Sequence, residues 1–164
     1  MKSVRDGLVL LVALVLQSTV LHRIEIAGAR PDLLIAFVVY IAWMRGPVVG
    51  TIAGFAVGLI QDLDASVPLG LNAFAKSLVG FLVAKAGFRV HRANAGVRFA
   101  FFFIAMLVHD VIYYGVASGG DPATFAKQMV LTAVPSALYT GVVVVILLGV
   151  VEIFSKRPIL ADEV

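Results

Sequence analysis

Long apolar stretches make up most of the chain, and short clusters of charged residues, glycine and proline separate them. Residues 141–151, for example, form an apolar run without a polar interruption. A helix that crosses the hydrocarbon core of a bilayer needs about 20 mainly apolar residues, within a range of roughly 17–25. By this measure the pattern predicts six transmembrane helices in a single domain. They are expected at about residues 5–24, 31–44, 47–62, 71–87, 97–117 and 129–154 of a domain that covers residues 1–164.

The second and third of these segments are short for independent transmembrane helices, so we expect their ends to be embedded in protein or in the membrane interface. The sequence Arg45-Gly46-Pro47 separates them. Glycine suits the end of a helix and proline suits its first turn, which favours two helices over one. Further along, Pro135 is expected to kink the sixth helix because proline removes a helical hydrogen bond.

The composition agrees with a membrane protein and excludes several other classes. Hydrophobic residues make up 61% of the chain, charged residues make up 14%, and the mean hydropathy is +1.03. Soluble domains carry roughly 25% charged residues, so this chain lacks the polar groups to coat a globule in water. A soluble enzyme and a disordered chain are therefore excluded, and the absence of cysteine excludes a disulfide scaffold. The expected fold class is an all-α polytopic integral membrane protein.

Lysine and arginine set the expected orientation, because they favour the cytoplasmic side of the membrane. With six helices and the N-terminus inside, nine basic residues lie on the cytoplasmic side and three on the other, while Lys76 lies within the fourth helix. The nine are Lys2, Arg5, Arg45, Lys85, Arg89, Arg92, Arg98, Lys156 and Arg157, and the three are Arg23, Arg30 and Lys127. Both termini are therefore expected in the cytoplasm, and the net charge of +3 requires no nucleic-acid partner. The basic residues between the fourth and fifth helices either enforce this topology or also contact anionic membrane lipids.

The N-terminal segment also has features of a signal peptide. Lys2 and Arg5 precede an apolar run, and Ala27-Gly28-Ala29 resembles a cleavage site with small residues. The charged stretch 22–25 lies between the two features, so we expect the segment to be retained as the first helix.

Glycine recurs every fourth residue in the third segment, at Gly46, Gly50, Gly54 and Gly58, and Asp62 continues the series. Positions four apart lie on one face of a helix, so these glycines form a stripe without side chains, here called the glycine ridge. Such a stripe allows another helix to approach closely in a membrane. The approaching helix is either one of the protein's own, which we favour, or a membrane-spanning partner.

Polar residues within the apolar segments form a second pattern. Asn72 and Lys76 share a face of the fourth segment, and His109 and Asp110 lie in the fifth. A charge at the bilayer centre costs roughly 2.5–3.5 kcal/mol on insertion scales, so Lys76 should be paired. We expect its counter-ion to be Asp62 or Asp110. The pair then either fixes the helix register or forms a ligand or proton site.

The residues for catalysis are not assembled in any familiar pattern. The chain contains no Gly-x-Ser-x-Gly motif, no phosphate-binding loop and no cysteine, and His22 and His91 belong to opposite sides of the predicted membrane. We therefore expect neither enzymatic activity nor a metal or other cofactor.

A series of short motifs, taken in order, resembles the MreD family of bacterial rod shape-determining proteins. The series comprises Pro31-Asp32-Leu33-Leu34, Val39-Tyr40, Arg45-Gly46-Pro47, the glycine ridge, Gln61-Asp62 and Pro68-Leu69-Gly70-Leu71-Asn72. The resemblance implies a non-enzymatic scaffold of the cell-elongation machinery in the bacterial inner membrane, which supports peptidoglycan synthesis and cell shape. Its implied partner is MreC, which has one membrane span, and more remotely MreB and the elongation transpeptidase and glycosyltransferase.

The same resemblance implies an architecture similar to the substrate-binding subunits of energy-coupling-factor transporters, which provides an alternative function. A subunit that binds a vitamin-type ligand should have an outward-facing pocket with several convergent polar groups. The predicted outer loops, at 62–70 and 118–125, are short and have few aromatic or hydrogen-bond donor residues. The sequence therefore favours the scaffold.

Overall fold

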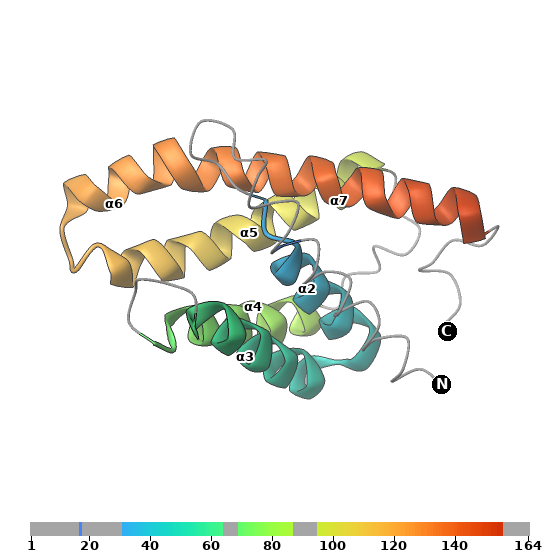
Figure 1. The fold of residues 1–164 in the computed structure, drawn as a ribbon, viewed down its shortest axis with the longest axis horizontal. Helices are drawn as coiled ribbons and strands as arrows, with labels where there is room; N and C mark the ends of the chain where they lie inside the picture. The colour runs from blue at the N-terminus through green and yellow to red at the C-terminus, as the bar shows by residue number, and fades with distance from the viewer. Residues whose placement is uncertain (1–16, 18–30, 64–68, 87–94, 156–164) are drawn as a thin grey trace.

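The computed structural model describes Gln17 and residues 31–63, 69–86 and 95–155, and every regular element within them is helical. The elements in chain order are α2 (Leu33–Arg45), α3 (Pro47–Leu63), α4 (Leu71–Lys85), α5 (Ala95–Ala117), α6 (Pro122–Gln128), a π-helical turn η3 (Met129–Ala133) and α7 (Val134–Ser155) (Figure 1). The helix expected at 5–24 lies outside the described residues, apart from Gln17.

Helix α2 occupies the centre of the arrangement. It contacts α3, α4, α5 and α7. Figure 1 shows α5 beneath the long rod formed by α6 and α7, with α3 and α4 as a pair at the opposite side of α2. Helix α4 also contacts α5, so the two pairs meet both directly and through α2.

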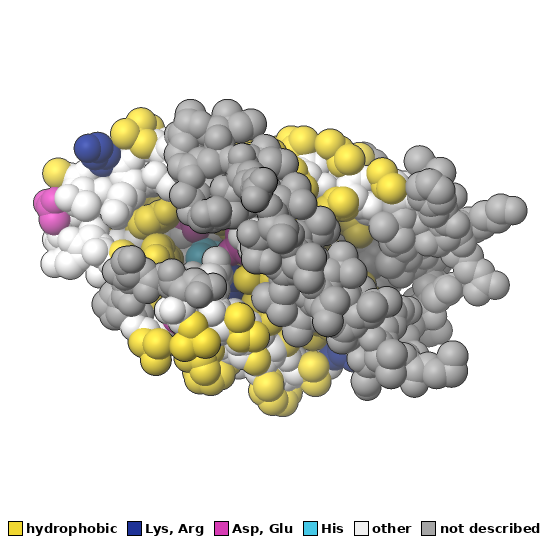
Figure 2. All heavy atoms as spheres, in the orientation of Figure 1, with side chains coloured by type: hydrophobic (Ala, Val, Ile, Leu, Met, Phe, Trp, Pro, Cys, Tyr) yellow, Lys and Arg dark blue, Asp and Glu magenta, His cyan; other side chains and the backbone are white. Residues whose placement is uncertain are grey.

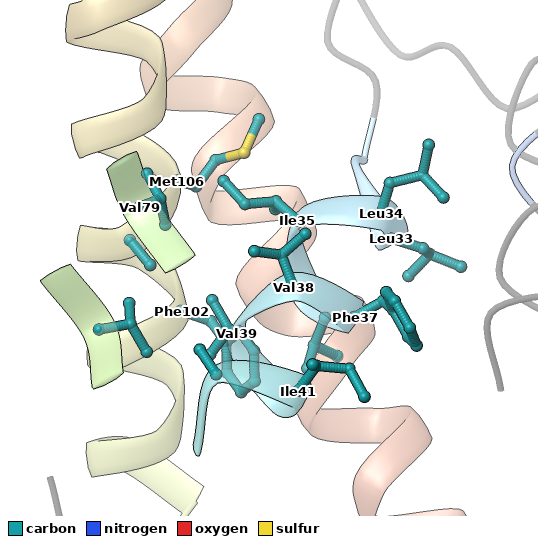
Figure 3. Packing of buried hydrophobic residues seen from close by; sticks show 14 of the residues in the cluster. Leu33, Leu34, Ile35, Phe37, Val38, Val39, Ile41, Val79, Phe102 and Met106 are labelled. Carbon is teal, nitrogen blue, oxygen red and sulfur yellow. The ribbon is translucent and has the colours of Figure 1, made fainter. Parts of the chain in front are cut away.

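The central position of α2 follows from its sequence, which is apolar on every face. Eight of its 13 residues are buried. Ile35, Val38 and Val39 point toward α5, whereas Leu33 and Phe37 lie on the other side of the helix (Figure 3). A helix that is hydrophobic all round is stable only when it is surrounded by apolar material. With 13 residues, α2 is only about 20 Å long, shorter than the roughly 30 Å hydrocarbon core. Protein contacts must therefore enclose its ends.

Two helices of the described residues are long and apolar enough to cross a membrane, namely Ala95–Ala117 and the continuous helical path Pro122–Val150. The second begins earlier than the expected segment 129–154. Asp121 starts it as an N-cap, and its side chain accepts hydrogen bonds from the Thr124 hydroxyl and from two backbone N–H groups. These bonds, above all the one from the Thr124 hydroxyl, hold the pKa of Asp121 below its ordinary value.

Where we expected a kink at Pro135, the structure has a wide helical turn just before this residue. The residues just before it, Met129–Ala133, are π-helical, and the N–H of Val134 donates to the carbonyl of Met129, five residues back. Proline provides no N–H, and its ring crowds the carbonyl four residues earlier. A wider turn immediately before proline therefore gives that carbonyl more room.

Apolar side chains also cover much of the outside of the molecule. They are visible along the edge formed by α3 in Figure 2. On this helix Val48, Ile52 and Phe55 are 70%, 63% and 52% exposed. Contiguous exposed apolar surface of this kind marks an interaction or membrane surface. The outward faces are therefore suited to lipid.

Three glycines of the ridge lie against α4. A Cβ added at Gly58 would lie 2.5 Å from the backbone of Ala73, and one added at Gly54 would overlap the carbonyl oxygen of Lys76. At Gly50 it would lie 2.7 Å from the Cβ of Ala42 in α2. The backbones of α3 and α4 therefore touch along this seam, and the ridge serves the protein's own packing in this structure.

Gly46 is not part of that seam. A Cβ at this position would meet nothing within 4 Å, but its φ is +84°, and its N–H donates to the carbonyl of Ala42 as the C-cap of α2. This left-handed conformation suits glycine because glycine has no Cβ. The four evenly spaced glycines thus have two different roles. Gly46 ends α2, whereas Gly50, Gly54 and Gly58 form the packing seam.

The seam predicts opposite effects for the same substitution at two helical glycines. Gly54→Ala should lower the free energy of unfolding by about 1–3 kcal/mol, because the new methyl group overlaps backbone that is fixed in α4. Gly115→Ala should leave stability unchanged or raise it by up to about 1 kcal/mol, because its Cβ meets nothing within 4 Å and alanine favours the helix. Thermal unfolding of both variants in detergent measures the difference. Equal stability of the two variants would contradict the seam.

Candidate functional site: a buried polar cluster

Four ionisable side chains from separate parts of the chain meet inside the helical arrangement. Lys76 of α4 is fully buried, and its Nζ lies 2.7 Å from Oδ2 of Asp32 and 3.2 Å from Nε2 of His109. Nδ1 of His109 lies 2.9 Å from Oδ1 of the adjacent Asp110. We call these four residues the polar cluster. In Figure 2, acidic, basic and histidine side chains are visible together near the middle of the molecule.

The chemistry of lysine fixes the direction of the hydrogen bonds. A lysine ammonium has three donors and no acceptor, so Nε2 of His109 must accept from it. The imidazole is then neutral, its hydrogen is on Nδ1, and this nitrogen donates to Oδ1 of Asp110. The cluster is thus an ordered chain of groups from Asp32 through Lys76 and His109 to Asp110.

Asp32 has a second task as the N-cap of α2. Its Oδ1 accepts hydrogen bonds from the N–H groups of Leu34 and Ile35 at 2.9 and 3.2 Å. Its own N–H donates to the hydroxyl of Thr140 in α7 at 3.0 Å, and the N–H of Leu33 donates to the side-chain oxygen of Gln17 at 2.9 Å. Side chains therefore satisfy all four N–H groups that a helix start leaves without a backbone partner.

Asp62, at the end of α3, caps α4 in the same way. Its carboxylate accepts from the backbone N–H groups of Gly70, Asn72 and Ala73 at 2.9, 3.0 and 3.1 Å, and from the Asn72 side-chain amide at 2.9 Å. The partial positive charge at a helix N-terminus stabilises a carboxylate placed there. Four donors from one helix start thus surround Asp62.

These contacts correct the expected partner of Lys76. The expectation of Asp62 or Asp110 was wrong, and the ion pair is formed with Asp32. Asp62 is occupied by the N-terminus of α4, and Asp110 reaches Lys76 only through His109. The structure also brings together the other polar residues named from the sequence. Asn72 lies with Asp62, and His109 and Asp110 lie with Lys76.

Sequence reasoning missed Asp32 and Thr140 as members of this site. An acidic residue immediately before an apolar helical segment is a known helix-start signal, and Pro31-Asp32 has that form. This signal identifies Asp32 as a cap but does not identify Lys76 as its partner. Nothing in the sequence around Thr140 distinguishes it from other threonines in apolar helices.

The cluster holds one lysine and two carboxyl groups, and its imidazole is neutral. Among the residues that the structure describes, no group of three or more histidine, cysteine, aspartate or glutamate side chains is arranged to hold a metal ion. The chemistry open to this arrangement is that of an ion pair and of proton binding.

Removing the lysine should identify its partner. Lys76→Met should lower the free energy of unfolding by about 3–5 kcal/mol, because it leaves the Asp32 carboxylate buried without a counter-charge. Asp32→Asn in the same background should restore part of the loss, since asparagine still caps α2 and carries no charge. Asp62→Asn should restore nothing. Thermal unfolding and accumulation of the single and double variants provide the test, and rescue by Asp62→Asn alone would contradict the observed pairing.

The comparisons with known proteins give one family. The family model of the rod shape-determining protein MreD matches residues 6–157, which covers nearly the whole chain. Searches of curated proteins and of solved structures give no match. Members of this family are non-enzymatic membrane proteins that maintain rod shape within the cell-elongation machinery. The chain therefore belongs to the MreD family of rod shape-determining proteins.

Proposed function

We propose that the chain acts as a scaffold that holds the single membrane span of MreC in the inner membrane. Through MreC it would connect to MreB and to the elongation transpeptidase and glycosyltransferase. The observation that carries this proposal is the match to the MreD family over residues 6–157. The same match favours the scaffold over the alternative of a subunit that binds a vitamin-type ligand.

The packing of the glycine ridge supports a particular place for the partner. Gly54 and Gly58 lie against α4, so a partner helix has no access to that stripe. The partner would then use an outward apolar face, on the first or the last membrane helix. On α7 the residues Leu138, Val142 and Ile146 recur every fourth position and are 45%, 46% and 58% exposed. Residues at this spacing form one continuous stripe along a helix.

We further propose six membrane spans with both termini in the cytoplasm, in an architecture similar to energy-coupling-factor binding subunits. The excess of basic residues in the predicted cytoplasmic segments supports this orientation. It places the C-terminal end of α5 at the outer surface. His109 lies eight residues, or about 12 Å, before that end. The polar cluster would accordingly lie in the outer half of the bilayer.

The proposed partner face can be tested by cross-linking, because the chain has no native cysteine. Ile146→Cys on α7 should cross-link to a cysteine introduced into the membrane span of MreC. Ile52→Cys is the matched control, since it is 63% exposed on α3 and lies on the other side of the molecule. Cross-linking from Ile52→Cys alone would overturn the assignment to α7. The scaffold proposal itself would be overturned if MreC did not co-purify with the wild-type protein.

The proposed topology is tested by two further single cysteines at exposed alanines. Ala126→Cys in α6 should react with a membrane-impermeant thiol reagent in intact spheroplasts. Ala95→Cys, at the start of α5, should react only after the membrane is permeabilised. The reverse pattern of labelling would show that the termini face outward.

A further inference from the structure

One oxygen of the polar cluster has no hydrogen-bond partner in the part of the chain that the structure describes. The Asp110 side chain is only 6% exposed, and its Oδ1 accepts from His109. Its Oδ2 is buried and receives no hydrogen bond among the residues that the structure describes. Both oxygens of Asp32 and both oxygens of Asp62 are, by contrast, hydrogen-bonded. Asp110 is thus the one buried carboxyl among these three that is incompletely bound.

Charge counting indicates what is missing. The Lys76 ammonium lies directly against Asp32, at 2.7 Å, and is separated from Asp110 by the neutral imidazole of His109. If both carboxyls were ionised, the cluster would carry one uncompensated negative charge. An isolated buried charge is far more costly than a buried hydroxyl without a hydrogen bond, so such groups take up a proton or a counter-ion.

Among the residues that the structure describes, the surroundings of Asp110 offer no second counter-ion. The groups that face it from the neighbouring elements are Asp32 before α2, Lys76 of α4, and His109, Tyr113 and Tyr114 of α5. Tyr113 stacks on the His109 ring at a centroid distance of 5.8 Å and so restrains its orientation. Lys76 is the only cation in this set, and it is already paired.

We propose that Asp110 is a proton-binding site, and that the polar cluster is a proton-dependent contact between α4 and α5. With the proton on Oδ2, the cluster is electrically neutral, and Oδ1 still accepts from Nδ1 of His109. When the proton leaves, the negative charge that appears on Asp110 competes with Asp32 for the Lys76 ammonium, which weakens the ion pair to Asp32. The ligand of this site is therefore a proton, and its release loosens the link among α2, α4 and α5.

The direct test is infrared spectroscopy of the full chain purified in detergent at neutral pH. The wild-type protein should show the carbonyl stretching band of a protonated carboxyl group, which shifts in heavy water and on carboxyl ¹³C labelling of aspartate. Asp110→Asn should lose this band. Asp121→Asn, the same substitution at an exposed carboxylate, should keep it. Absence of the band from the wild-type protein overturns the proposal even if Asp110→Asn fails to fold, and so does a band that persists in folded Asp110→Asn.

Unfolding as a function of pH provides a second readout. A carboxyl group that holds a proton in the folded state and releases it in the unfolded chain makes the folded state less stable as pH rises. Above the ordinary titration range of an aspartate, the thermal midpoint of the wild-type protein should therefore fall with rising pH, and this fall should be smaller in Asp110→Asn. If sodium ions instead raise the midpoint of the wild-type protein but not of Asp110→Asn, and no carboxyl band is seen, the site holds a metal cation and the proposal is wrong.

Discussion

The arrangement of this MreD protein depends on how two helix starts inside the protein satisfy their backbone N–H groups. A helix start leaves four such groups without partners, and in a membrane no bulk water is present to bind them. Asp32 and Asp62 solve this problem with carboxylates that accept several N–H groups each. Because both carboxylates are charged, this way of capping the helices brings negative charge into an apolar interior. The other buried polar residues can be understood as a response to that charge.

The negative charge of Asp32 explains why a lysine is buried at position 76. Asp32 caps α2 with one oxygen and binds Lys76 with the other, so the same side chain fixes where α2 begins and where α4 lies beside it. The glycine seam packs α4 against α3, and the backbone at Lys76 is the part of α4 that touches Gly54. Lysine at this position is therefore held from two directions. The short helix α2 needs these contacts because it is too short to span the hydrocarbon core by itself.

Within the described residues, the sequence predicts the positions of the helices better than the side-chain pairings, for a physical reason. Apolar runs indicate where helices lie, and the four-residue spacing of Gly50, Gly54 and Gly58 indicates a close helix contact. The counter-ion of Lys76, however, depends on which carboxylate remains available after backbone N–H groups have bound theirs. Asp62 looked available in the sequence because the N–H groups of α4 that occupy it appear in no side-chain pattern. Only the spatial approach of α4 to the end of α3 reveals that competition.

The polar cluster also bears on how a non-enzymatic membrane protein uses buried charge. A buried ion pair adds little stability over an apolar pair of the same size, but breaking it is costly, so its best-supported role is to fix one arrangement among several. In a membrane, apolar helix faces are nearly equivalent, because lipid is as apolar as leucine and sets no preference for one helix register over another. A pairing such as Asp32 with Lys76 removes the freedom to choose another register, because a shifted register would leave a buried charge without its partner. For a protein whose role is to maintain rod shape within the cell-elongation machinery, a single fixed arrangement of its outer faces is the property that the buried charges provide.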